Sequence, residues 1–231
     1  MLALFDVDGT LLLTSDPLAG RALSATLEER YGIDLPENPV RRVDHPGQTC
    51  LRIARLVLRD AGLTDGVIDG GLAGWCGEFA ARYVELLSDT DTSGWRAPAG
   101  AAGALARLSA AGITLALLTG NPEPMARARM ERLGLAGRFP PGQGGFGCDA
   151  EERRALIDRA WERAGATVSE TVAVGDTPRD VHSAQAAGIR VIVLRSPEHP
   201  AAGDEADAVC DTLDEVADLL LAWDGRPTAQ G

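Results

Sequence analysis

Short apolar runs that alternate with helical segments are the feature of this 231-residue sequence that most restricts its fold. Residues 2–5, 113–118, 171–174 and 189–194 are almost wholly apolar and too short for helices, so we predict that each is a buried strand. Strands of this kind, separated by helices, form parallel sheets that are covered on both faces. The pattern therefore predicts an α/β fold, a Rossmann-like parallel sheet flanked by helices.

Between these strands, apolar residues recur at helical spacing, and glycine or proline marks where the predicted helices begin or end. Two segments are expected to be irregular, the glycine-rich stretch 137–147 and the tail from Asp224 onward. The predicted helices of this part of the chain are residues 100–111, 123–133, 151–164, 178–187 and 213–223.

The long interval between the first two strands predicts a separate all-helical unit. It contains three amphipathic segments, at residues 18–31, 49–61 and 67–87, with no convincing strand among them. A Ser-, Asp-, Gly- and Pro-containing stretch at 88–98 then predicts a linker. We therefore predict an inserted helical domain over residues 15–92 and an α/β core domain made of residues 1–14 and 93–231.

Composition excludes several classes of function. The net charge of −12 disfavours nonspecific binding to nucleic acid or to an anionic membrane, and no apolar run is long enough to span a bilayer. The first eight residues include two acids and do not resemble a signal peptide, so a cytoplasmic location is expected. All 22 basic residues are arginine, which excludes any mechanism that needs a lysine Schiff base.

The four cysteines, Cys50, Cys76, Cys148 and Cys210, are far apart in the sequence and form no CxxC pair. This spacing predicts free, mostly buried thiols rather than a metal or redox motif.

Two acids follow the first predicted strand, at the edge where open parallel sheets bind ligands. Asp6 and Asp8 can point to the same side because side chains alternate along an extended chain, and Gly9 allows a sharp turn beside a ligand. Two adjacent carboxylates favour a hard divalent cation such as Mg²⁺. The alternative is an ordinary Asp-Gly turn after a strand.

Polar residues also follow the second and third predicted strands. Thr119, Gly120 and Asn121 precede a helix and could form an anion site, although Thr or Asn could simply cap that helix. Asp176 and Asp180 could reach a cation from the side opposite Asp6, or could serve only the start of the next helix. Because all three groups lie at one sheet edge, together they favour a metal site.

A basic residue is expected to reach the phosphate of a phosphorylated ligand, and in this chain it must be an arginine. Arg153 and Arg154 are at the start of a predicted helix directly after the glycine-rich stretch. One guanidinium group can bind two phosphate oxygens at once. The alternative is a solvated surface pair.

These motifs resemble those of the haloacid dehalogenase (HAD) superfamily, in particular phosphatases with a helical C1-type cap similar to phosphoglycolate phosphatases. The motifs extend over nearly the whole chain, and Arg153 is better placed than Arg154 for the third one. The matching residues are Asp6, Asp8, Gly9 and Thr10 for the first motif, Thr119, Gly120 and Asn121 for the second, Arg153 for the third, and Gly175, Asp176 and Asp180 for the fourth.

The resemblance implies a Mg²⁺-dependent phosphatase that works through an aspartyl-phosphate. Asp6 would attack phosphorus, and Asp8 would protonate the leaving oxygen and later deprotonate water. The implied metal ligands are Asp6, Asp8 through its backbone carbonyl, Asp176 and Asp180. The implied phosphate-binding residues are Gly9, Thr10, Thr119, Gly120, Asn121 and Arg153.

The sequence departs from relatives of this cap type at one stretch. Many carry Gly-x-Thr-Asp in the cap, and here Cys50 stands in the place of the acid, so no substrate is transferred from them. Arg41, Arg42 and His45 lie just upstream and either face the site or belong to a solvated surface.

A small-molecule phosphate ester is the expected substrate, because an inserted domain covers the predicted site. Two alternatives stay open, a sugar phosphomutase similar to β-phosphoglucomutase and a non-catalytic binding module. The oligomeric state stays open as well.

Overall fold

A six-stranded parallel sheet forms the centre of residues 1–225, the part of the chain that the computed structural model describes. Its strand order is β3-β2-β1-β4-β5-β6, with every neighbouring pair parallel. The strands are β1 (Leu2–Phe5), β2 (Thr114–Thr119), β3 (Gly144–Phe146), β4 (Thr171–Gly175), β5 (Arg190–Leu194) and β6 (Ala208–Cys210). The predicted α/β fold with a Rossmann-like parallel sheet is confirmed.

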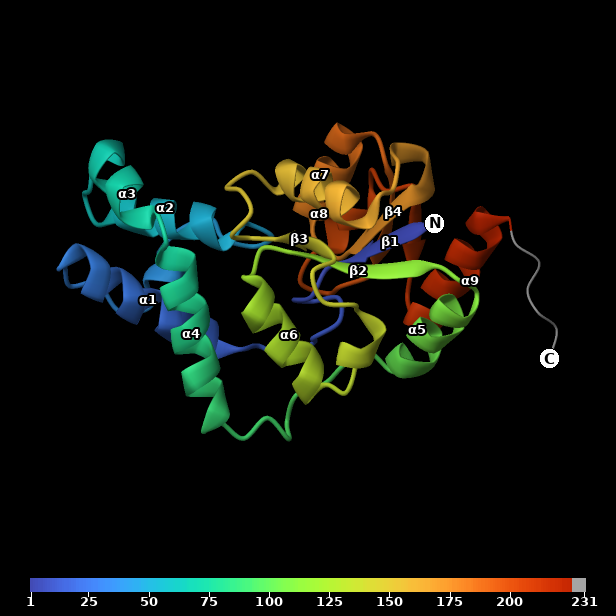
Figure 1. Cartoon of the computed structure of the whole chain (residues 1–231), viewed down its shortest axis with the longest axis horizontal. Helices are drawn as coiled ribbons and strands as arrows, with labels where there is room; N and C mark the ends of the chain where they lie inside the picture. The colour runs from blue at the N-terminus through green and yellow to red at the C-terminus, as the bar shows by residue number, and fades with distance from the viewer. Residues whose placement is uncertain (226–231) are drawn as a thin grey trace.

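Helices cover both faces of this sheet (Figure 1). One apolar cluster joins α7 and α8 to one face, and another joins α5, α6 and α9 to the other. The α-helices are α1 (Pro17–Tyr31), α2 (Cys50–Asp60), α3 (Asp65–Leu72), α4 (Trp75–Ser88), α5 (Ala101–Ala110), α6 (Glu123–Arg132), α7 (Arg153–Ala164), α8 (Pro178–Ala187) and α9 (Leu213–Asp224). Four short 3₁₀ helices lie at Pro39–Arg42, Ala136–Arg138, Val168–Glu170 and Pro200–Gly203.

Strand β1 is central, with β2 and β4 on its two sides. Phe5 at its end pairs in register with Leu117 of β2 and Val174 of β4. The residues that follow these three strands therefore emerge at the same edge, as the sequence predicted for the groups around Asp6 and Asp176.

Two short strands were not predicted. Residues 137–147 were expected to be a loop, yet Gly144–Phe146 forms β3 against β2. A Cβ on Gly144 would lie 2.1 Å from the carbonyl oxygen of Leu117, so this strand needs glycine where strand propensity disfavours it. The prediction was wrong because close backbone packing selects the residues here. The other missed strand, β6, has only three residues at the sheet edge.

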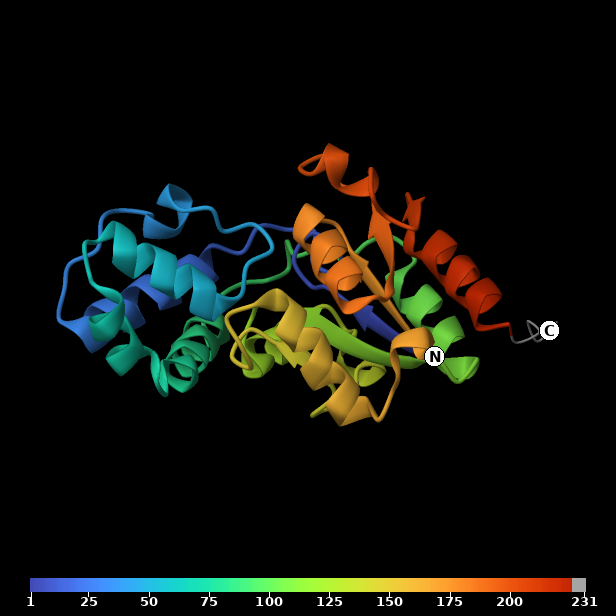
Figure 2. The same ribbon diagram turned by 90° about the horizontal axis from the view of Figure 1, so that it is seen from above.

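Helices α1 to α4, which we call the cap, pack around their own apolar cluster beside the sheet domain (Figure 2). Trp75 is fully buried in it, donates from its indole N–H to Thr26 Oγ1 at 3.0 Å and stacks on Phe79 at 5.0 Å between ring centres. The single helix expected over 67–87 is wrong, because α3 ends at Leu72 and α4 begins at Trp75. Gly74 between them has a φ of 79°, a left-handed conformation that breaks the helix.

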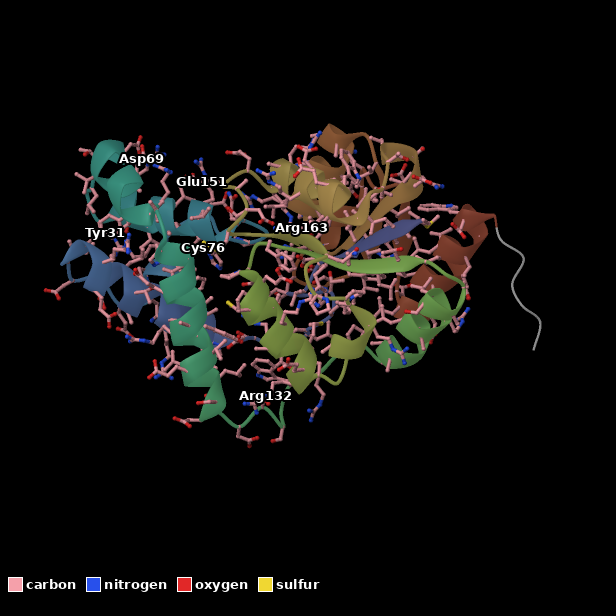
Figure 3. The ribbon with its side chains drawn as sticks, viewed as in Figure 1. Tyr31, Asp69, Cys76, Arg132, Glu151 and Arg163 are labelled. Carbon is pink, nitrogen blue, oxygen red and sulfur yellow. A yellow bond between two sulfur atoms is a disulfide. The ribbon has the colours of Figure 1, made fainter. Side chains whose placement is uncertain are left out.

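A disulfide between Cys76 and Cys148 corrects the prediction of four free thiols. Cys76 is in the first turn of α4, and Figure 3 shows it where the cap meets the sheet domain. Cys148 follows β3, so the bond joins two domains through residues that are 72 positions apart, a proximity that cysteine spacing does not reveal. Cys50 and Cys210 are free and buried among the described residues.

Within residues 1–225, no helix is both long and apolar enough to cross a membrane. Asp224, where a loose tail was predicted to begin, is the last residue of α9, and residues 226–231 of that tail lie outside the described part of the chain.

Candidate active site

Three carboxylates meet at the carboxyl ends of β1 and β4. Asp6 follows β1, Asp176 follows β4, and Asp180 lies in the first turn of α8. One oxygen of each carboxylate lies within 4.8 Å of the others, and all three side chains are buried. Hard oxygen donors gathered in this way form a site that suits a divalent cation such as Mg²⁺.

The turn after β1 brings the chain against this cluster. Gly9 has a φ of 84°, and a Cβ there would lie 2.2 Å from the Asp176 carboxylate, so only glycine fits. Thr10 is buried beside it and donates from its hydroxyl to Asp176 Oδ1 at 3.2 Å. The turn thus positions Asp176 in addition to Asp6.

Arg153 provides positive charge inside the cluster. At the start of α7 its Nη2 donates to Asp6 Oδ1 at 2.8 Å and also to Asp180 Oδ1. Its Nη1 donates to the Gly47 carbonyl of the cap at 3.2 Å. Arg154 instead lies outside the site, with its guanidinium over the ring of Trp161. Only Arg153 of this pair is brought to the carboxylates.

Asp180 serves the helix and the site at the same time. Its Oδ2 accepts from the Thr177 backbone N–H at 2.9 Å and from the Thr177 hydroxyl at 2.6 Å, which forms a capping box at the start of α8. Its Oδ1 faces Arg153. The sequence posed capping and the metal cluster as alternatives, and the structure shows one carboxylate placed for both.

Asp8 lies on the solvent side of this cluster, with its side chain 54% exposed. The Asn121 amide donates to Asp8 Oδ2 and, at 2.9 Å, to the Thr119 hydroxyl. The residues after β1 and β2 are therefore joined directly.

Arg129 also contacts Asp8, and sequence reasoning missed it. This arginine of α6 donates from Nη1 to both Asp8 oxygens at 2.9 Å. Its position could have been noticed, because helical spacing places Arg129 on the same face as Met125 and Ala126, which are fully buried. A cation on the apolar face of a helix needs a buried partner.

The environment of Asp6 and Asp176 opposes their ionised forms even with Arg153 nearby. Burial, followed by repulsion from Asp180, raises the pKa of Asp6 well above its usual value, although Arg153 opposes this shift. Burial and repulsion from Asp180 likewise raise the pKa of Asp176 to about 7. Arg153 alone therefore does not compensate the negative charge, and the donor set fits Mg²⁺ as the missing positive partner.

Backbone of the cap covers the site. The Cys50 N–H donates to the Gly120 carbonyl at 2.7 Å, and a Cβ on Gly120 would lie 2.0 Å from the carbonyl oxygen of Gln48. Thr49 Oγ1 donates to the Glu151 carbonyl at 2.8 Å, and Figure 3 shows Glu151 on the loop that faces the cap. Gly120, predicted to bind phosphate, thus also forms the contact between cap and core.

The three basic residues upstream of this contact do not enter the carboxylate cluster. Arg41 and Arg42 are exposed, and Arg42 donates to Asp60 at 2.7 Å. His45 Nδ1 lies 3.1 Å from the Val43 carbonyl. For the two arginines the structure agrees with the solvated-surface alternative.

Comparison with known proteins identifies the family. Residues 1–188 match the haloacid dehalogenase-like hydrolase model, and the chain belongs to this family. A phosphoglycolate phosphatase of Rhodospirillum rubrum is 32% identical over 99% of this chain and 92% of its own length. Hexitol phosphatase A of Escherichia coli is 30% identical over 92% of this chain and 91% of its own length.

The fold agrees with this assignment. A CbbY variant of Rhodobacter sphaeroides, solved in complex with xylulose-(1,5)-bisphosphate, superposes with a TM-score of 0.67 and 23% identity, covering 93% of this chain and 95% of that one.

The glycine turn provides a first test of the cluster. We expect Gly9→Ala to lower metal affinity about 10- to 100-fold, because the new Cβ displaces Asp176. The metal affinity is measured by titrating Mg²⁺ and recording the Tm of the protein at each concentration. Gly134→Ala is the matched control, since Gly134 has a φ of 70° with nothing within 4 Å, so it should cost about 1 kcal/mol of stability and leave metal affinity unchanged. Equal metal affinity in the two variants would contradict this account of Gly9.

The raised pKa of Asp176 predicts how stability depends on pH. Without metal, Asp176 is protonated in the folded state up to about pH 7, whereas in the unfolded state it loses its proton near pH 4. Between these pH values the folded state binds more protons, so the contribution of this carboxyl to the free energy of unfolding falls as the pH rises. Because Mg²⁺ replaces the proton, the increase in Tm on adding Mg²⁺ should be larger near pH 8 than near pH 5. Asp176→Asn should reduce this difference without abolishing it, because the pKa of Asp6 is raised as well. A Tm increase that is equal at both pH values would refute the prediction.

Proposed function

We propose that this protein is a Mg²⁺-dependent phosphatase that hydrolyses a small-molecule phosphate monoester through an aspartyl-phosphate on Asp6. The observation that carries the proposal is the buried group of Asp6, Asp176 and Asp180 with Arg153 at the strand ends. Its membership of the HAD-like hydrolases and its phosphatase relatives support the same activity.

The first step is assigned to Asp6 and Asp8. A carboxylate oxygen of Asp6 attacks phosphorus while the bond from phosphorus to the ester oxygen breaks, and Asp8 donates its proton to that leaving oxygen. Arg153, already bonded to Asp6 at 2.8 Å, is placed to bind equatorial phosphoryl oxygens, together with Thr119 and the backbone amides near Gly120.

The second step returns the enzyme to its starting state. Asp8, now ionised, removes a proton from water as the water oxygen attacks the aspartyl-phosphate. The bond between phosphorus and Asp6 breaks, which releases inorganic phosphate. Asp8 suits this work because its side chain is half exposed while Asp6 is buried.

Mg²⁺ would be held by Asp6, the Asp8 backbone carbonyl, Asp176 and Asp180, and when bound it would reduce the repulsion between Asp6 and the phosphate. Burial strongly raises the pKa of Asp6, so the ionised nucleophile depends on positive charge nearby.

The cap supports a small substrate. Asp6 and Arg153 are buried beneath the stretch from Gly47 to Cys50, where a folded phosphoprotein would not reach them. The names of the relatives refer to phosphoglycolate and hexitol phosphatases, which are both phosphatases of small molecules. We therefore propose a small phosphate ester as the substrate class. We also propose that the protein acts in the cytoplasm.

A sugar phosphomutase is the second candidate, because the same aspartyl-phosphate can return its phosphoryl group to a sugar. Product analysis with a sugar phosphate separates the two, since a phosphatase releases inorganic phosphate and a mutase releases an isomeric sugar phosphate.

Substitution of the nucleophile tests the proposal. Asp6→Asn should keep the fold and lower phosphate release from small esters by about 10³-fold or more. The matched control is Asp218→Asn, an exposed α9 residue paired with Arg107, which should keep wild-type rates. The assay compares a panel of esters with and without Mg²⁺. Full activity of Asp6→Asn, or release that does not need the metal, would refute the mechanism.

A further inference from the structure

We propose that Arg129 is a positioning residue that holds Asp8 for its acid–base work and links Asp8 to the cap. This proposal rests on the role of Asp8 in the proposed function. It starts from the position of one buried guanidinium, on α6, between the candidate site and the first residues of the cap.

Arg129 is almost fully buried and bonds to two carboxylates on opposite edges. Its Nη1 donates to Asp8, and its Nη2 donates to Asp16 Oδ2 at 2.7 Å. Its Nε lies 3.1 Å from both Asp16 Oδ2 and the Tyr83 hydroxyl, and that hydroxyl donates to Asp16 at 2.6 Å. The guanidinium also lies over the Tyr83 ring, 5.2 Å from its centre.

These partners belong to different parts of the molecule. Asp8 follows β1, Asp16 is the N-cap of α1, and Tyr83 is on α4 of the cap. A guanidinium has a rigid planar shape, so a shift of Asp16 and Tyr83 moves the edge that Asp8 accepts from. The orientation of Asp8 therefore depends on the position of the cap.

Arg129 is not a substrate ligand in this arrangement. Each of its three side-chain nitrogens already donates to a protein oxygen. Asp8, in contrast, is half exposed, and Arg129 on one side and the Asn121 amide on the other select one of its several rotamers. Proton transfer needs an oxygen within about 2.6–3.2 Å of the reacting atom, so a fixed Asp8 is worth most when the leaving group needs a proton.

The test compares kcat/KM for two esters that differ in leaving group. The leaving group of an alkyl phosphate is a strongly basic alkoxide unless its oxygen is protonated. The leaving group of p-nitrophenyl phosphate is p-nitrophenolate, which departs without being protonated. Arg129→Lys and Arg129→Met should lower kcat/KM for the alkyl ester about 10²-fold, since general acid catalysis contributes about that much. The value for p-nitrophenyl phosphate should change far less. Since kcat/KM covers the steps up to the first phosphoryl transfer, hydrolysis of the aspartyl-phosphate does not obscure the comparison.

A second variant covers the case in which Arg129 variants do not fold. Tyr83→Phe keeps the ring and removes the hydroxyl that bonds Asp16 and Arg129, so it should show a smaller loss with the same preference for the alkyl ester. Tyr31→Phe is its matched control, because the Tyr31 hydroxyl donates to the Ile68 carbonyl within the cap at 2.6 Å, with no contact to Arg129. It should affect both esters equally.

Asp8→Asn separates the two proposals. If Asp8→Asn loses activity selectively on the alkyl ester while the Arg129 and Tyr83 variants lose equally on both esters, the role of Arg129 is refuted and the proposed function stands. If Asp8→Asn itself shows no preference between the esters, the acid role of Asp8 in the proposed function is wrong.

A different observation carries a second proposal: we infer that the Cys76–Cys148 disulfide is a redox latch that keeps the cap on the core. The chain passes between the two parts twice, and these passages lie side by side, with the Leu13 N–H donating to the Arg96 carbonyl at 2.8 Å. The disulfide adds a third connection, outside this pair of linkers. Two adjacent linkers act as a hinge, whereas a third covalent bond elsewhere stops rotation about it.

The cap must open before a substrate can reach Asp6 and Arg153, because both residues are buried under it. Cys50, whose N–H bonds to the Gly120 carbonyl in the covering backbone, has its sulfur 3.9 Å from both Cys76 and Cys148. The latch is therefore beside the contact that must separate. A dithiol reductant would open it by supplying two electrons and two protons, which give two cysteine thiols as the reductant becomes a disulfide.

Thiol titration and amide exchange test the latch in the full chain. Denatured protein should show two free thiols when oxidised and four after treatment with a dithiol, since four cysteines are present and Cys50 and Cys210 are free. Reduction should speed amide exchange at the Cys50 N–H and restore phosphate release that oxidation suppresses. Cys148→Ser should abolish both responses, and Cys210→Ser, away from the latch, should keep them.

Four free thiols without reductant, or exchange that is equally fast in both forms, would overturn the latch. Because amide exchange does not depend on turnover, a latch that responds in a protein with no phosphatase activity would refute only the proposed function.

Discussion

Burial of three neighbouring carboxylates in one corner of the sheet is the constraint on which the rest of the site depends. Asp6, Asp176 and Asp180 are held together by backbone geometry that also builds the fold: the register of β1 with β4 and the capping box of α8. Arg153 offsets part of the charge, yet burial and repulsion from Asp180 keep the pKa of Asp6 raised, so a further cation would favour its ionised form. A cluster of buried oxygen donors such as this suits the metal and the phosphoryl group of the proposed function.

The same corner explains why cap and core meet where they do. Arg153 bonds to Asp6 and to the Gly47 carbonyl, so one side chain connects the proposed nucleophile to the covering backbone. The Gly120 carbonyl accepts a hydrogen bond from the Cys50 N–H, so the cap packs against the motif that follows β2. This close approach requires glycine at position 120, because a Cβ there would lie 2.0 Å from the carbonyl oxygen of Gln48.

Much of this arrangement could be predicted from the sequence, because it depends on local rules. Apolar runs located β1, β2, β4 and β5, and reading the residues after them located Asp6, Asp176 and Asp180 at one edge. Two of the misses, strand β3 and the disulfide, share a physical reason, which is that each depends on tertiary contact. Strand β3 consists largely of glycines selected by backbone packing, and the Cys76–Cys148 bond joins residues that only the closed cap brings together.

Arg129 shows how the absence of lysine shapes the site. Its fork reaches Asp8 on one edge and Asp16 on the other, which a single ammonium would do poorly. Arg153 also joins two acids, although Asp6 and Asp180 both accept from the same nitrogen, Nη2, while Nη1 donates to the Gly47 carbonyl. Each of the two acids proposed for chemistry is thus held by its own buried arginine, and each arginine also contacts the cap, Arg153 through Gly47 and Arg129 through Tyr83. Movement of the cap would therefore shift the partners of the proposed nucleophile and of the proposed acid–base group together.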